Sequence, residues 1–124
     1  MLRDDDVVIF LASKNPAAAR SFYETVLGLT FVADEPYALV FELNGRMLRI
    51  AKVNELAPAR HTVLGWQVPD IEKKVKELQD RGVEFLRFAG MPQDPLGIWT
   101  SPSGAKVAWF SDPDKNALSL TQFS

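Results

Sequence analysis

The dipeptide Asn44-Gly45 constrains the fold of this chain more than any other feature of its sequence. A type I′ turn needs positive φ at both central residues, which asparagine and glycine accept readily, and such turns join two antiparallel strands. Runs of alternating apolar and polar residues flank the dipeptide at residues 38–43 and 46–52. The sequence therefore predicts a β-hairpin over residues 38–52.

The register of this hairpin gives its strands two different faces. Across a two-residue turn, one face pairs Leu39 with Ile50, Phe41 with Leu48, and Leu43 with Arg46. The other face pairs Val40 with Arg49 and Glu42 with Met47. We expect the first, mostly apolar face to be covered by helices and the second to be a mixed surface.

Two helices are predicted from capping residues and apolar spacing. Asn15 is a favourable N-cap and Pro16 suits the first helical position, while Gly28 is placed to end that helix. A second helix is predicted from Asp70 to Gly82, because apolar residues recur at helical spacing between them.

The remaining strands are predicted from short apolar, β-branched and aromatic runs bounded by turn residues. They cover residues 7–12, 30–33, 62–68, 84–88, 98–101, 106–111 and 117–122. Residues 28–31 (Gly-Leu-Thr-Phe) and 82–85 (Gly-Val-Glu-Phe) follow the two helices at the same place, which indicates a duplication. We therefore predict an α+β fold with two tandem βαβββ modules, approximately residues 6–53 and 61–124.

Composition and charge argue against several classes of function. The net charge is -2 and the basic residues form no stripe, so a nucleic-acid partner is not expected. No apolar run approaches the roughly 20 residues of a membrane span. The chain has no cysteine for disulfides or thiolate ligands. Its start, Met-Leu-Arg-Asp-Asp-Asp, is unlike a secretory signal, so the cytoplasm is the expected compartment.

Three motifs point to a known family. Residues 22–28 read Phe-Tyr-Glu-Thr-Val-Leu-Gly, residues 68–71 read Val-Pro-Asp-Ile, and residues 112–116 read Asp-Pro-Asp-Lys-Asn. With these motifs the chain resembles the vicinal-oxygen-chelate superfamily, the fold of glyoxalase I, bleomycin-resistance proteins and extradiol dioxygenases. Lys115 stands where the family usually has glycine, so a non-glycine residue must accept the geometry of that turn.

The resemblance implies a cupped mixed sheet with helices on its outer face and a small-molecule site in the cup. Many members hold one divalent metal there, and members often form dimers, so a homodimer is expected. The metal-ligand positions of the family correspond to Val8, Arg49, Val63 and Ser119 of this chain.

These four residues are unsuited to a metal. Valine offers no lone pair, arginine carries a charge and no acceptor, and serine is a weak neutral ligand. A cation beside Arg49 would be repelled, on the order of a few kcal/mol at an effective dielectric constant of roughly 20. We therefore predict no metal and no cofactor, and a site that meets an anionic or carbonyl group of its ligand at Arg49.

Strand alternation assigns a set of side chains to this site, which is apolar and partly aromatic with a few polar groups. The predicted ligand-binding residues are Phe10, Glu42, Met47, Arg49, Val63, Gln67, Trp109, Ser119 and Thr121. Val8, Val40 and Gly65 share the predicted face, and the sequence does not fix the side that Trp99 faces.

Several of these residues have simpler roles open to them. Arg49 could pair with Glu42, its diagonal neighbour, with or without binding a ligand. Phe10 and Trp109 could pack in a core or a dimer interface. His61, the only histidine, is more typical of a surface or hinge position than of a metal ligand.

Three hypotheses of function follow. The first is a metal-independent small-molecule binding protein, similar to the antibiotic-sequestering members of the superfamily. The alternative is a metal-dependent lyase or dioxygenase with displaced ligands such as Glu42 and His61. The third is a purely structural or interaction role, since a fold alone does not determine function.

Overall fold

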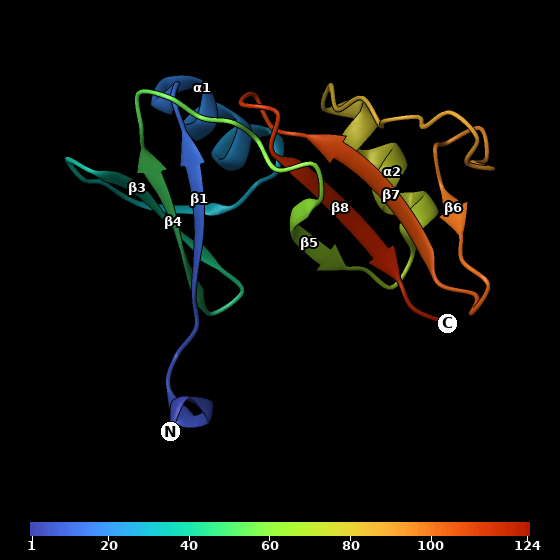
Figure 1. Cartoon of the computed structure of the whole chain (residues 1–124), viewed down its shortest axis with the longest axis horizontal. Helices are drawn as coiled ribbons and strands as arrows, with labels where there is room; N and C mark the ends of the chain where they lie inside the picture. Colours follow the sequence, from blue (N-terminus) through green and yellow to red (C-terminus); the bar gives the residue numbers. More distant parts are fainter. The chain divides into compact units, whose positions relative to one another are not determined.

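Two four-stranded mixed sheets organise the chain, one in each of two units, Met1–Ala57 and Pro58–Ser124 (Figure 1). The computed structural model describes residues 1–124. Each unit runs from a strand through helical structure to three further strands. The predicted α+β fold with two βαβββ modules is therefore confirmed.

The first unit has the strand order β1-β4-β3-β2, with β1 parallel to β4 and the other neighbours antiparallel. Its elements are a 3₁₀ turn (Leu2–Asp4), β1 (Val8–Ser13), α1 (Pro16–Arg20), a π-helical segment (Ser21–Val26), β2 (Thr30–Asp34), β3 (Ala38–Leu43) and β4 (Arg46–Lys52). The bounds of β3 and β4 are those predicted, and β1 is displaced by one residue.

The β3–β4 hairpin has the turn that its sequence requires. Asn44 and Gly45 have φ values of 49° and 82°, so both central residues are left-handed, as in a type I′ turn. The ladder has the predicted register from Leu43↔Arg46 to Leu39↔Ile50. The apolar face of the hairpin is therefore fixed as one side of the sheet.

The first helix begins as predicted and changes pitch midway. The Asn15 side chain accepts a hydrogen bond from the Ala18 N–H at 3.3 Å, which caps the first turn. After Arg20 the helix widens into π geometry, and the Leu27 N–H donates to the Phe22 carbonyl at 2.9 Å. Gly28 then ends it with φ of 74°.

This helix covers the apolar face of the first sheet. Tyr23 is fully buried, and its ring centroid lies 6.0 Å from that of Phe41 on β3. Arg20 adds a cation–π contact, with its guanidinium carbon 3.7 Å from the centroid of the Phe31 ring. The core of the first unit is completed by Leu11, Ala19, Leu39, Leu43, Leu48 and Ile50.

The second unit has the strand order β5-β8-β7-β6, again with one parallel pair, β5 with β8. Its elements are β5 (Thr62–Gln67), α2 (Ile71–Asp80), β6 (Trp99–Thr100), β7 (Lys106–Ser111) and β8 (Ala117–Gln122). Helix α2 has ten residues, and no helix of the chain is long and apolar enough to cross a membrane.

Helix α2 is capped at its start and buries one face. The Asp70 side chain accepts from the Lys73 N–H at 3.2 Å, and the Ile71 N–H donates to the Gln122 side chain of β8 at 2.9 Å. Ile71, Val75 and Leu78 are buried as predicted. The start of the helix is therefore tied to the last strand of its own unit.

The predicted strand over residues 84–88 is wrong, because a side chain takes the place of a strand partner. Gln93 accepts from the Phe88 N–H at 2.8 Å and donates to the carbonyls of Leu86 and Gly97 at 2.9 and 2.8 Å. One backbone bond, from the Leu86 N–H to the Trp109 carbonyl, joins this segment to β7. The predicted strand over residues 98–101 is also shorter and covers only Trp99–Thr100.

The turn at residues 112–116 is held by a buried carboxylate. Asp112 Oδ1 accepts from the backbone N–H groups of Asp114 and Asn116, each at 2.9 Å, and Oδ2 accepts from the Asn116 side-chain amide at 2.8 Å. Lys115 has φ of 69°, so a non-glycine residue does accept the left-handed geometry here.

Candidate functional site

Arg49 lies in the middle of β4 on the sheet face that does not carry the apolar residues of the hairpin. Its ladder partners are Phe10 on β1 and Val40 on β3, so these three side chains share one face. Glu42 and Val8 pair with Met47 on the same face. The predicted site residues of the first unit are therefore brought together on one surface.

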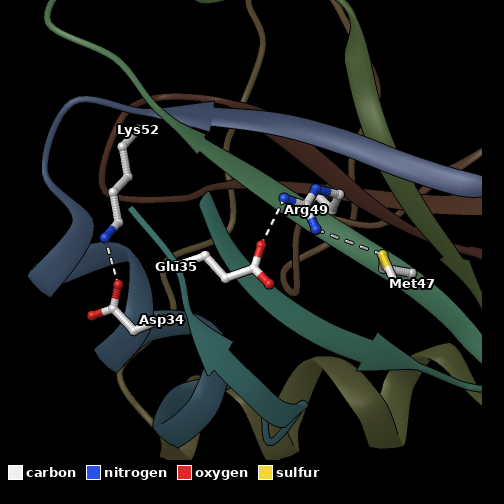
Figure 2. Close-up of polar contacts among 5 residues, drawn as sticks. All are labelled: Asp34, Glu35, Met47, Arg49 and Lys52. Carbon is white, nitrogen blue, oxygen red and sulfur yellow. Dashed lines mark hydrogen bonds and ion pairs between the residues drawn. The ribbon is translucent and has the colours of Figure 1, made fainter. Parts of the chain in front are cut away.

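The guanidinium of Arg49 pairs with Glu35 and not with Glu42, the alternative partner that the hairpin register offered. Arg49 Nη2 donates to Glu35 Oε1 at 2.8 Å, and Nη1 points to the sulfur of Met47 at 4.0 Å (Figure 2). The Arg49 side chain is 30% exposed and that of Glu35 is 46% exposed. Solvent therefore reaches the pair from one side.

Glu42 forms a hydrogen bond within its own hairpin. Its Oε1 accepts from the Gly45 N–H at 2.5 Å, which ties the end of β3 to the hairpin turn. Glu35 reaches Arg49 because it follows β2 directly and its N–H donates to the Ala38 carbonyl at 2.9 Å. The short β2–β3 connection thus holds the Glu35 carboxylate over β4.

A second ion pair lies on the opposite face of the same strands. Lys52 contacts Asp34, the last residue of β2 (Figure 2). Asp34 pairs in the ladder with Leu39, which in turn pairs with Ile50, so the Lys52–Asp34 pair shares the helix-covered face. It offers a matched comparison for Arg49 and Glu35.

Apolar side chains around Arg49 are unusually open to solvent. Phe10 is 65% exposed, Met47 43% and Val8 40%. Val8 and Met47 also line an open groove of about 590 Å³, together with Val7, Arg46, Gly45 and the two acidic residues Asp5 and Asp6. Exposed apolar surface beside a half-buried guanidinium suits a ligand with an apolar body and a polar group.

The corresponding face of the second sheet is aromatic. Trp109 pairs with Ser119, and Val107 pairs with both Trp99 and Thr121, so these side chains share one face. The Trp109 ring lies 5.5 Å from that of Phe88 and 6.1 Å from that of Trp99. The side that Trp99 faces, open from the sequence, is therefore the side of Trp109.

Ser119 is buried, and its ladder neighbour on β5 is a glycine. Gly65 and Gln67 pair with Ser119 and Thr121. A Cβ atom on Gly65 would lie 2.8 Å from the Ser119 hydroxyl, so a side chain there would force that hydroxyl to shift. The ladder shifts register between Thr62 and Leu64, and strict alternation therefore does not fix the side that Val63 faces.

The donor set at the four family positions does not fit a metal. Val8 and Val63 supply no lone pair, Arg49 carries a positive charge held to Glu35, and Ser119 is a buried neutral hydroxyl. No group of three or more His, Asp or Glu side chains is placed to hold a metal. His61 is exposed on the segment before β5, and the half-buried Trp66 stacks on the buried Phe110 with ring centroids 6.3 Å apart.

Two residues of these surfaces, Glu35 and Phe88, were absent from the predicted site, and the side of a third, Trp99, was left open. Glu35 lies in the three-residue connection between β2 and β3, outside the hairpin whose register gave Glu42 as a possible partner of Arg49. Phe88 was assigned to a strand and Trp99 was left without a facing. An acidic residue just outside a short strand connection is the signal that could have found Glu35.

Comparison with known proteins places the chain in a structural context. Residues 7–120 match the sequence profile of the Glyoxalase/Bleomycin resistance protein/Dioxygenase superfamily. The chain is similar to TnmS3, an antibiotic binding protein from Streptomyces sp. CB03234, with 24% identity, a TM-score of 0.76, and coverage of 100% of this chain and 99% of that one.

Two further solved structures show the same fold at lower identity. A superfamily member from Sphaerobacter thermophilus has 22% identity and a TM-score of 0.75, covering 98% of this chain and 99% of that one. A lactoylglutathione lyase from Agrobacterium tumefaciens has 18% identity and a TM-score of 0.69, with coverage of 96% and 93%. No protein with curated annotation matches the sequence significantly.

Proposed function

Because the chain belongs to the Glyoxalase/Bleomycin resistance protein/Dioxygenase superfamily, we propose that it is a metal-independent small-molecule binding protein. Its ligand has an apolar or aromatic body and a polar group that accepts hydrogen bonds from Arg49. The observation that carries this proposal is the exposed apolar surface of Phe10 and Met47 around that guanidinium.

The chemistry of the four family positions favours binding over metal-assisted catalysis. A Lewis-acid mechanism needs carboxylate or imidazole ligands, and the four family positions offer two valines, an arginine and a serine. Arginine instead binds oxygen acceptors through a planar set of N–H donors. The name of TnmS3 as an antibiotic binding protein supports a binding role on this fold.

The aromatic surface of the second unit supports an aromatic ligand. Trp99, Trp109 and Phe88 present ring faces and edges that stack on planar molecules, and Thr121, Ser119 and Gln67 add hydrogen-bonding groups nearby. We propose that this surface of the second unit binds a planar aromatic group. The homodimer and the cytoplasmic location expected from the sequence remain predictions.

A thermal-shift screen tests the proposal directly. A ligand of the native state raises the melting temperature by mass action, so compounds with aromatic bodies and carbonyl or carboxylate groups are expected to raise it without added metal. Metal analysis of protein purified without chelators is the companion measurement. About one equivalent of zinc, iron, nickel or manganese would contradict the proposal and favour the lyase or dioxygenase alternative.

Arg49→Ala is expected to weaken the binding of a hit from this screen by about ten- to hundredfold, because a hydrogen bond to a charged group contributes about 1.5–3 kcal/mol. Isothermal titration calorimetry measures the change. Lys52→Ala is the matched control, because it removes a cation of the same strand whose partner Asp34 lies on the opposite face. Equal losses in both variants would remove Arg49 from the site.

A further inference from the structure

We propose that Glu35 is a specificity-determining residue that makes this site select ligands with a neutral carbonyl oxygen over ligands with a carboxylate or another anionic group. The inference rests on the proposed function and narrows it to a class of ligand. Its basis is the ion pair that Glu35 forms with Arg49.

Glu35 occupies the position that a ligand carboxylate would take. Its Oε1 lies 2.8 Å from Nη2 of Arg49, which is the distance of a charge-assisted hydrogen bond. The backbone of Glu35 is held by its hydrogen bond to the Ala38 carbonyl, so the side chain is tethered close to the guanidinium (Figure 2). A tethered group acts as a competitor at an effective concentration of about millimolar or higher.

An anionic ligand therefore gains little binding free energy from an ion pair with Arg49. If it displaces Glu35, one carboxylate replaces another and the number of ion pairs is unchanged. If Glu35 stays, the ligand anion lies beside a like charge. Glu42 adds a second negative charge to the same face, so the three charged groups Arg49, Glu35 and Glu42 sum to -1.

A neutral acceptor can bind without displacing Glu35. The other terminal nitrogen of Arg49, Nη1, points to the Met47 sulfur at 4.0 Å, and a thioether is a weak acceptor. A ligand carbonyl oxygen is a stronger acceptor and would take the place of the sulfur. The exposed, unbranched Met47 side chain can move aside, because its thioether stem has several rotatable bonds.

Two isosteric probes and one inorganic anion test the inference. The dissociation constants of 2-naphthamide and 2-naphthoate, which differ in charge and little in shape, are measured by calorimetry for the native protein and for Glu35→Gln. Asp34→Asn is the matched control, because it neutralises the neighbouring carboxylate on the opposite face. In parallel, the melting temperatures of all variants are compared in sodium sulfate and in sodium chloride of equal ionic strength.

We expect the native protein to prefer the amide, and Glu35→Gln to gain about tenfold in affinity for the carboxylate while Asp34→Asn keeps the native ratio. Sulfate should raise the melting temperature of Glu35→Gln more than that of the native protein, and the excess should vanish in the double variant Glu35→Gln/Arg49→Ala. An unchanged amide-to-carboxylate ratio in Glu35→Gln, or the same change in Asp34→Asn, would overturn the inference.

The two arms separate failure of the inference from failure of the proposed function. If neither naphthalene probe binds any variant, the proposed binding role is contradicted for aromatic ligands, and the sulfate arm alone decides the role of Glu35. An excess sulfate effect in Glu35→Gln that depends on Arg49 then still supports Glu35 as the group that excludes anions. Equal sulfate effects in all variants overturn it.

Discussion

Replacing Phe110 with alanine is expected to lower the free energy of unfolding by about 3–5 kcal/mol, the largest loss we predict for a single side chain. Phe110 lies on β7 and is fully buried. Its ring stacks on Trp66 at 6.3 Å and meets the Phe85 ring edge-on at 5.5 Å. Removal leaves a cavity beside the Trp66 and Phe85 rings, and the backbone ladder prevents β7 from moving to fill it. Urea denaturation followed by far-UV circular dichroism measures the change.

Phe123 is the matched control for this substitution. It also belongs to the second unit, but it is 62% exposed and follows the end of β8. Phe123→Ala is expected to change the free energy of unfolding by no more than about 0.5 kcal/mol. Similar losses in the two variants would show that Phe110 is not a central part of this core.

Asp112→Ala is expected to lower the free energy of unfolding by about 3 kcal/mol, because it leaves several donors of one turn without their acceptor. Asp112 is buried and accepts from two backbone N–H groups and from the side-chain amide of Asn116. These bonds are coupled, so their energies do not simply add. Thermal and urea denaturation of the variant measure the loss.

Two companion variants identify the cause of that loss. Asp112→Asn keeps an oxygen acceptor for the backbone N–H groups of Asp114 and Asn116, and we expect it to retain part of the stability. Asp80→Ala removes an exposed carboxylate at the end of α2, where a negative charge opposes the helix dipole. This variant should not lower the free energy of unfolding. If Asp112→Asn lowers the free energy of unfolding as much as Asp112→Ala does, the charge of Asp112 and not its hydrogen bonding stabilises the turn.

Local chemistry was enough to predict the elements that depend on their own residues. The Asn44-Gly45 turn, the Asn15 cap and the Gly28 terminus all follow from conformations that few other residues adopt. The family resemblance, stated from residues 22–28 and 112–116, was confirmed by the match over residues 7–120. These signals are short-range, so a single sequence contains them fully.

Features that depend on distant partners were not predictable in this way. Residues 84–88 have the composition of a strand, but Gln93, within the Gly/Pro-rich loop that follows, bonds the Phe88 N–H and the Leu86 carbonyl with its side chain. The register makes Glu42 a diagonal neighbour of Arg49, but Glu42 accepts a hydrogen bond from the N–H of Gly45 in the turn after β3, and Glu35 forms the ion pair with Arg49. Which side chain forms a given hydrogen bond is decided by tertiary geometry, and the periodicity of the sequence does not predict it.

The positions of the tryptophans give one half of this protein an intrinsic fluorescent probe. Trp66, Trp99 and Trp109 all belong to the second unit, and the first unit has none. Indole emission therefore reports on residues 58–124 alone, whereas the peptide circular dichroism signal sums over the whole chain. Midpoints that coincide for the two signals would mean that both halves unfold in one cooperative step, and separate midpoints would assign each transition to its own half.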